Sequence, residues 1–167
     1  MTRLLLRIED VTTGVALRAS IAFLVVAATL ALYQVVTRFV FDAPSTWSEV
    51  VTRSAMIWSV FLGVAVAFRH GAMISVDVIQ NALPGRLGLG LHLAAGAASL
   101  VFFSILLWQG WLMTLRVAPQ RLAALEVSIA WVYAALPVGS AFILVAVAAS
   151  MARAARGDWA AARDAGA

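Results

Sequence analysis

The sequence predicts an all-α integral membrane protein: a bundle of four transmembrane helices plus a short amphipathic helix at the cytoplasmic membrane surface. Three observations lead to this fold class. The chain of 167 residues is 63% hydrophobic and only 12% charged, whereas soluble domains average about 25% charged residues. Four apolar stretches are long enough to cross the roughly 30 Å hydrocarbon core of a bilayer. The arginines are scattered at the ends of these stretches, as is typical of membrane proteins.

The four predicted spans make one membrane domain of residues 1–167. They are centred on apolar runs at about 15–37, 46–68, 87–115 and 127–150. We interpret the first as a retained helix rather than a signal peptide. Its apolar run exceeds the roughly 7–15 residues of the apolar region in a signal peptide, and no small-residue cleavage site follows it. Residues 151–167 are predicted to form a cytoplasmic tail.

The distribution of arginine predicts the orientation. An even number of spans places both termini on one side of the membrane. The side with the termini carries eight arginines: Arg3, Arg7, Arg18, Arg69, Arg86, Arg153, Arg156 and Arg163. The opposite side carries four: Arg38, Arg53, Arg116 and Arg121. Because loops rich in basic residues stay in the cytoplasm, both termini are predicted to be cytoplasmic.

The connection between the second and third spans contains the predicted amphipathic helix, at about 72–83. Asp77, Gln80 and Asn81 fall together on a helical wheel, and apolar residues occupy the opposite arc. This pattern favours a helix that lies on the membrane surface and ends at Pro84. A solvated connector is the alternative.

A polar cluster opens the second span, in the segment FDAPSTWSEVVTR. Thr46 and Glu49 have the spacing of a helix-capping box. Glu49 also precedes Arg53 by four residues, the favourable order for a helical ion pair, and Trp47 suits the membrane–water interface. The cluster therefore starts a helix. Together with the nearby Arg38, it also has the chemistry to dock a partner or to tether the first two helices, and the two interpretations are compatible.

Small residues recur every four positions in the second span, at Ala55, Ser59, Gly63 and Ala67. Such a stripe allows another helix to approach closely. The neighbouring helix can belong to the same bundle or to another subunit, and the pattern alone does not distinguish the two.

The middle of each span carries few polar side chains, and Asp, Glu, Lys and Arg are absent from the centres. Ion pathways generally require such groups. Gln109 can hydrogen-bond to a neighbouring helix, and His92 most simply does the same. Pro137 frees the carbonyl of Tyr133 and predicts a kink. We predict no catalytic residue, no metal site and no cofactor, and the chain has no cysteine.

Several short motifs, taken in order, resemble the small membrane subunit of TRAP transporters (tripartite ATP-independent periplasmic transporters, DctQ-like). The resemblance covers about residues 20–145. It rests on the run from Gln34 to Phe41, then Trp47-Ser48-Glu49, Arg53, Trp58, Phe61-Leu62-Gly63, Arg69, Gly71, Ile74 to Asp77, Leu83-Pro84 and Pro137-Val138-Gly139. Val50 departs from the family pattern, where a second acidic residue is frequent, and so does Met73, where a histidine is frequent.

The resemblance implies a non-enzymatic subunit in the bacterial inner membrane. A large membrane subunit (DctM-like) would carry an organic acid together with Na⁺, and a periplasmic substrate-binding protein would deliver it. The small subunit would pack beside the large one in the lipid bilayer and serve as its scaffold. The residues predicted for partner or structural contacts are Arg38, Trp47, Glu49, Arg53, Ser59, Gly63, Asp77 and Pro137.

Two rival functions stay open at the level of sequence. One is the membrane anchor of a redox complex, with His92 and His70 holding haem. The other is a stand-alone homo-oligomeric channel of four helices per chain. Nucleic acid is not an expected partner, because the net charge of +4 arises from arginines scattered along the chain.

Overall fold

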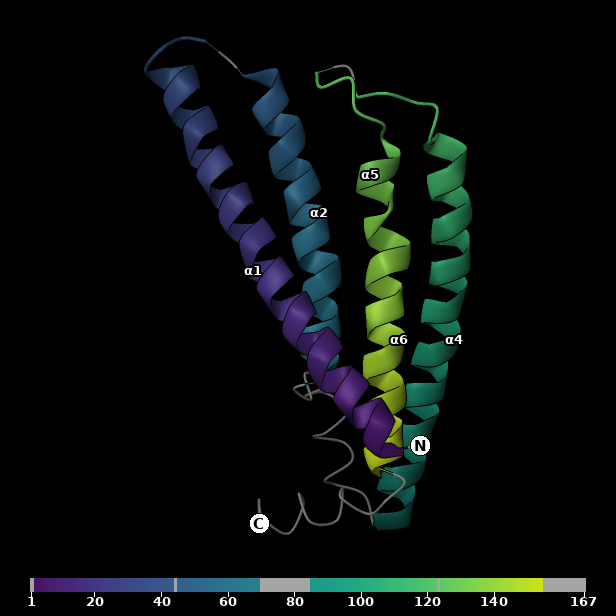
Figure 1. The fold of residues 1–167 in the computed structure, drawn as a ribbon. Coiled ribbons are helices and arrows are strands. Elements are labelled where there is room, and N and C mark those ends of the chain that lie inside the picture. Colours follow the sequence, from purple (N-terminus) through teal and green to yellow (C-terminus); the bar gives the residue numbers. More distant parts are fainter. Residues whose placement is uncertain (1, 44, 70–84, 123, 155–167) are drawn as a thin grey trace.

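The computed structural model describes residues 2–43, 45–69, 85–122 and 124–154 (Figure 1). The helices of this part are α1 (Thr2–Phe39), α2 (Thr46–Arg69), α4 (Gly85–Val117), α5 (Ala130–Tyr133) and α6 (Ala135–Ala154). The described residues contain four stretches long and apolar enough to cross a membrane, with α5 and α6 forming one of them. The predicted all-α membrane fold is therefore confirmed.

Two boundaries differ from the sequence prediction. Helix α1 begins at Thr2, well before residue 15, and continues through polar residues to the apolar run. Residues 127–129 lie in a loop, and the last span starts at Ala130. The predicted surface helix at 72–83, including Asp77, lies outside the described residues. The same is true of His70 and of the tail beyond Ala154.

The last span is interrupted at Ala134, between α5 and α6 (Figure 1). Pro137 explains this position, because proline has no N–H to donate to the carbonyl four residues earlier, which belongs to Tyr133. Hydrogen bonding resumes beyond the break, where the Val138 N–H donates to the Ala134 carbonyl at 3.1 Å. The irregularity thus lies one turn before the proline, at the carbonyl that it leaves free.

The spans stand side by side in the order α1, α2, α6, α4, which differs from their order in the chain (Figure 1). Helix α1 slants across this layer, so that it also meets α6. The central helices bury more of their apolar stretches, 33% in α2 and 44% in the α5–α6 span, against 11% in α1 and 6% in α4. The edge helices therefore leave most of their apolar surface for lipid or for another protein.

Small residues bring the helices together. A Cβ added at Gly139 of α6 would lie 2.7 Å from the Phe61 Cβ of α2, and one at Gly96 of α4 would lie 2.7 Å from Met151 of α6. Such close approach is how helices associate where lipid offers no hydrophobic driving force. The interior is built mainly from α2 and α6, with Leu62 and Ile143 among its buried members.

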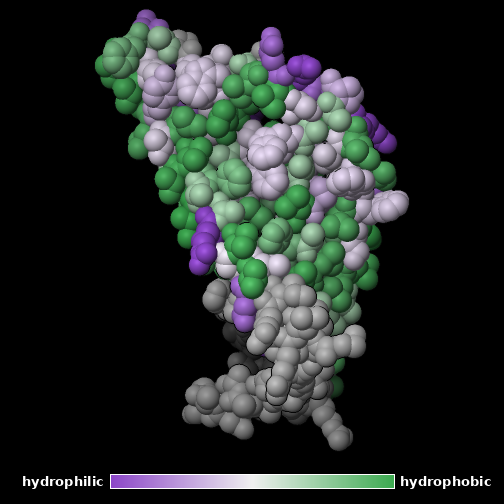
Figure 2. All heavy atoms as spheres, in the orientation of Figure 1, coloured by the Kyte–Doolittle hydropathy of each residue, from purple (hydrophilic) through white to green (hydrophobic). Residues whose placement is uncertain are grey.

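The two ends of the layer are formed by different segments. We call the end formed by residues 40–43, 45, 118–122 and 124–129 the loop end, and the end with the start of α1 and the finish of α6 the terminal end. Figure 2 shows hydrophilic residues at the loop end of the visible face, above a broad apolar surface. A band of apolar surface beneath a polar rim is the pattern expected of a protein that sits in a bilayer.

Candidate functional site

The loop end contains the polar cluster that the sequence singled out. Helix α2 begins at Thr46, and the buried Ser48 hydroxyl donates to the Ser45 carbonyl at 2.9 Å. Trp47 is exposed, with its ring 5.9 Å from the ring of Tyr33 on α1. These aromatic rings lie where amphipathic side chains anchor a helix at the membrane–water interface.

Glu49 and Arg53 pair with each other along the surface of α2. The guanidinium of Arg53 donates to the Glu49 carboxylate at 2.5 Å, and the two side chains are 73% and 59% exposed. The spacing of four residues places them on one face of the helix. The predicted ion pair is therefore confirmed, and the capping box of Thr46 and Glu49 stays a prediction. Arg38 stays apart, exposed, with its guanidinium carbon 6.0 Å from the Phe39 ring centre.

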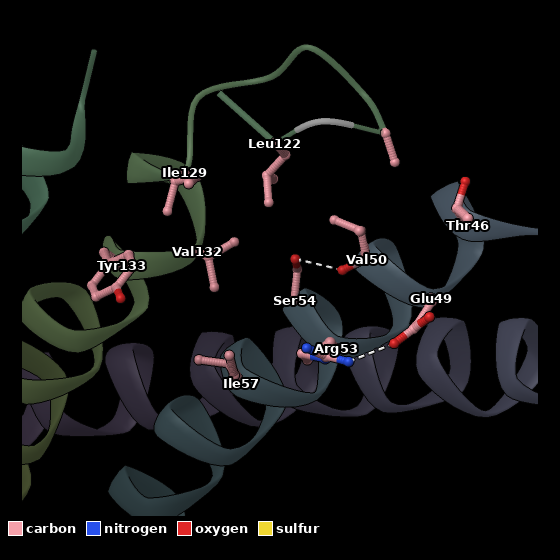
Figure 3. A pocket seen from close by; sticks show the side chains of 11 residues that line it. Thr46, Glu49, Val50, Arg53, Ser54, Ile57, Leu122, Ile129, Val132 and Tyr133 are labelled. Carbon is pink, nitrogen blue, oxygen red and sulfur yellow. Dashed lines mark hydrogen bonds and ion pairs between the residues drawn. The ribbon is translucent and has the colours of Figure 1, made fainter. Parts of the chain in front are cut away.

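A pocket of about 320 Å³ lies beside this ion pair, between α2 and the segment that leads into α5 (Figure 3). Figure 3 shows Val50, Ser54 and Ile57 on one wall and Leu122, Ile129 and Val132 facing them. Its full lining comprises Thr46, Glu49, Val50, Arg53, Ser54, Ile57, Leu122, Ala124, Ile129, Val132 and Tyr133. An apolar hollow with a charged pair at its edge can accept an apolar side chain of a partner and fix its register by polar contacts.

The loop between α4 and α5 folds back on itself as a small hairpin, which the sequence analysis missed. Leu122 and Val127 are joined by a backbone hydrogen bond of 2.8 Å, and Glu126 adopts a positive φ of 54° at the turn. The Ser128 hydroxyl accepts from the Ala130 N–H at 3.2 Å and donates to the Ala118 carbonyl at 2.8 Å. The Ser128 hydroxyl therefore links the end of α4 to the residue that begins α5.

The small-residue stripe of α2 faces α1 of the same chain. The Ser20 hydroxyl donates to the Ser59 carbonyl at 2.9 Å. A Cβ at Gly63 would lie 3.2 Å from the same Ser20 oxygen. Nearer the loop end, the Gln34 amide donates to the Thr52 hydroxyl at 2.8 Å. Both polar bonds join α1 to α2, so the described contacts of Ser59 and Gly63 are internal to the chain.

Trp58 ties together three elements and was not singled out as a structural residue from sequence. Its indole N–H donates to the Trp131 carbonyl at 3.1 Å. Its ring lies 5.6 Å from Phe23 on α1 and 5.3 Å from Trp131 on α5. A buried tryptophan normally satisfies its N–H in this way, and here it holds the broken helix against α1 and α2.

Pro137 is buried, and Gly110 of α4 lies against it. A Cβ added at Gly110 would come within 3.2 Å of the Pro137 Cδ. The proline therefore interrupts the last span and also forms part of the α4–α6 contact.

A second ion pair lies at the terminal end, where sequence reasoning predicted none. Arg153 of α6 donates to the carboxylate of Glu9 on α1. The Glu9 side chain is 1% exposed and that of Arg153 is 33% exposed. The other Glu9 oxygen, Oε1, is buried without a hydrogen-bond partner. The two residues are 144 positions apart in the sequence, so no local spacing predicts their pairing.

The described residues offer little for catalysis or metal binding. They contain no group of three or more His, Asp or Glu side chains placed to hold a metal ion. His92 lies partly buried on α4. The contacts described above are those of helix packing and of aromatic side chains at the ends of the spans, as expected of a small helical membrane protein.

Comparison with known proteins identifies the family. The sequence model described as "Tripartite ATP-independent periplasmic transporters, DctQ component" matches residues 27–157. A similar protein is the "Sialic acid TRAP transporter small permease protein SiaQ" of Vibrio cholerae serotype O1. It is 26% identical over 144 residues, which cover 86% of this chain and 79% of the relative. The chain belongs to the DctQ component family of TRAP transporters, and the resemblance predicted from sequence is confirmed.

Family membership makes this protein a small permease subunit of a transporter rather than an enzyme. With its four apolar spans, it is a bacterial inner-membrane protein. Family membership also favours the transporter interpretation over the redox anchor and the stand-alone channel.

Proposed function

We propose that this chain is the scaffold for the large membrane subunit of a TRAP transporter. That subunit would take up an organic acid with Na⁺, and a periplasmic binding protein would deliver the acid. The observation that carries the proposal is the layer of four spans, whose edge helices leave most of their apolar surface uncovered within the chain. A scaffold needs such faces, because it must contact both lipid and a partner.

The second support is the chemistry of the span centres. In the described part, the middle turns of the spans carry no Asp, Glu, Lys or Arg. Substrate and ion pathways normally place polar or ionisable groups there. The transport pathway therefore belongs to another subunit, and this chain holds that subunit in place.

The test is uptake by proteoliposomes that contain the large subunit, the binding protein and a Na⁺ gradient, with or without this chain. Radiolabelled sialic acid is the first probe because of the similar SiaQ protein, followed by other carboxylic acids. We expect uptake only when all components are present. Equal uptake without this chain would contradict the scaffold, and uptake by this chain alone would favour the channel.

We further propose that both termini are cytoplasmic and that the loop end faces the periplasm, where Arg38, Trp47, Glu49 and Arg53 help to dock the binding protein. The arginine distribution supports this orientation. The chain has no cysteine, so Gln120→Cys and Val11→Cys each introduce a single thiol. In intact spheroplasts, a membrane-impermeant thiol reagent should label the first variant and not the second. The reverse pattern would invert the topology.

A further inference from the structure

Gln109 of α4 is a polar side chain in an apolar setting. It is exposed, and its amide makes no hydrogen bond with the described residues. Its exposed neighbours on the helix, Ile105, Trp108 and Leu112, are all large and apolar. An amide needs hydrogen-bond partners when it leaves water, and lipid chains supply none.

Gln109 lies too deep in the predicted hydrocarbon layer for its amide to reach water at the membrane surface. It precedes Arg116, at the loop end of α4, by seven residues, or about 10 Å of helix. A leaflet of hydrocarbon is about 15 Å thick, so the residue lies well inside it. Helical side chains also lean toward the helix N-terminus, which for α4 is the far end. The amide therefore leans toward the membrane centre and away from the nearer interface.

Gln34 provides the internal comparison. It is the other amide side chain within the described spans. It lies on α1 close to Arg38 at the loop end, and it donates to Thr52 of α2 at 2.8 Å. One span amide is thus satisfied inside the chain, whereas the other is directed away from it. Exposed hydroxyls such as Ser104 differ, because serine can bond to its own helix backbone.

The residues in line with Gln109 repeat at alternating intervals of three and four. The set is Phe102, Ile105, Gln109, Leu112 and Arg116, all exposed. We call it the Gln109 seam. Spacing of this kind is the seam of a left-handed helix pair, which is the common crossing in membranes. Arg116 has no ion pair among the described residues, so the seam ends in an uncompensated positive charge.

We propose that a transmembrane helix of the large subunit packs on the Gln109 seam. That helix would present a hydrogen-bonding side chain opposite Gln109 and an acidic side chain near Arg116. The proposal rests on the proposed function, since it names the face on which the scaffold receives its partner. The exposed side of α1 is then left to lipid, because no unpaired amide lies on it in the described residues.

The experiment uses the complete transporter expressed from its native operon, with a photo-crosslinking amino acid in place of Gln109. The matched control carries the same group at Leu32 of α1, which is 69% exposed and lies seven residues from Phe39, at a similar depth. We expect position 109 to crosslink to the large subunit and position 32 to crosslink to lipid. Crosslinking of position 109 to lipid or to a second copy of this chain would overturn the proposal.

A second measurement separates this inference from the proposed function. Gln109→Leu should lower recovery of the large subunit in a mild-detergent pull-down by about threefold to tenfold, with unchanged thermal stability of the isolated chain. Gln109→Asn should restore part of the recovery. Gln34→Leu should instead lower the stability of the isolated chain. Full recovery of the large subunit with Gln109→Leu would overturn the proposed seam and leave the scaffold function intact. If the unaltered chain recovers no large subunit, both the seam and the scaffold function are overturned.

Discussion

The described residues form an ion pair at either end of the layer, and these two pairs differ in almost every respect. At the loop end, Glu49 and Arg53 sit one turn apart on α2, and both are mostly exposed. At the terminal end, Glu9 and Arg153 join the first and the last described helices, and the Glu9 side chain is almost wholly buried. The first pair is local and accessible, whereas the second holds distant parts of the chain together.

This difference separates surface chemistry from structural support. An exposed pair four residues apart contributes about 0.3–0.5 kcal/mol, so Glu49 and Arg53 are free to serve recognition without a large effect on stability. A buried charge that loses its partner costs several kcal/mol. Glu9 and Arg153 therefore fix where α1 crosses α6, whereas the exposed pair at the loop end suits the docking role proposed above.

The largest expected effect follows from removing the buried charge pair. Arg153→Gln should leave the buried Glu9 carboxylate without its counter-charge and destabilise the chain by about 3 kcal/mol, the lower end of the range for buried pairs. Thermal unfolding in detergent measures this change. Glu9→Gln should cost less, because it removes the buried charge and the Arg153 side chain left behind is 33% exposed. A melting temperature unaffected by Arg153→Gln would remove the structural role of the pair.

A smaller loss is expected where α6 touches α2, between the two ends. Gly139→Ala would force a Cβ to within 2.7 Å of the Phe61 Cβ, which costs about 1–3 kcal/mol, offset by up to about 1 kcal/mol of helix propensity. Gly90→Ala is the matched control, because nothing lies within 4 Å of its added Cβ. We expect the first variant to melt lower and the second not to. Equal melting temperatures would contradict the close approach of the two helices.

The loop-end half has its own internal anchor, and Trp58→Phe probes it. The substitution keeps most of the ring but removes the N–H that donates to the Trp131 carbonyl, which costs about 1 kcal/mol. Trp108→Phe is the control, since Trp108 is exposed and makes no hydrogen bond among the described residues. The expected readout is a lower melting temperature for Trp58→Phe alone. A loss as large as that expected of Arg153→Gln would contradict the difference in stability that we assign to the two ends.

The smallest effect on stability is expected at the exposed pair. Arg53→Gln should change the free energy of unfolding by at most about 0.5 kcal/mol but should weaken binding of the periplasmic protein to the complete transporter. Surface plasmon resonance with the transporter in nanodiscs measures this affinity. A clear drop in melting temperature with unchanged affinity would reverse the roles that we assign to the two pairs.

The sequence predicted those features that depend on local pattern. Hydropathy located the four spans, because a bilayer requires about 20 apolar residues as helix, and the spacing of Glu49 and Arg53 predicted their pairing. Pro137 indicated an irregular last span, although the break lies at Ala134, beside the carbonyl that the proline leaves unpaired.

Features set by contacts between distant segments were not predicted. The order α1, α2, α6, α4 and the bond between Trp58 and Trp131 have no periodic signature. The pairing of Glu9 with Arg153 spans 144 residues, and Glu9 lies in a polar stretch that the sequence analysis placed before the first span. The last span was predicted to begin at residue 127, within an apolar stretch, whereas its helix begins at Ala130.

The most direct test of the central claim is a mild-detergent pull-down of this chain, tagged and expressed from its native operon. The scaffold account predicts recovery of a much larger membrane protein with many spans, in a fixed ratio to this chain. Recovery of this chain alone, as a discrete homo-oligomer, would contradict that account and would favour a self-contained channel instead.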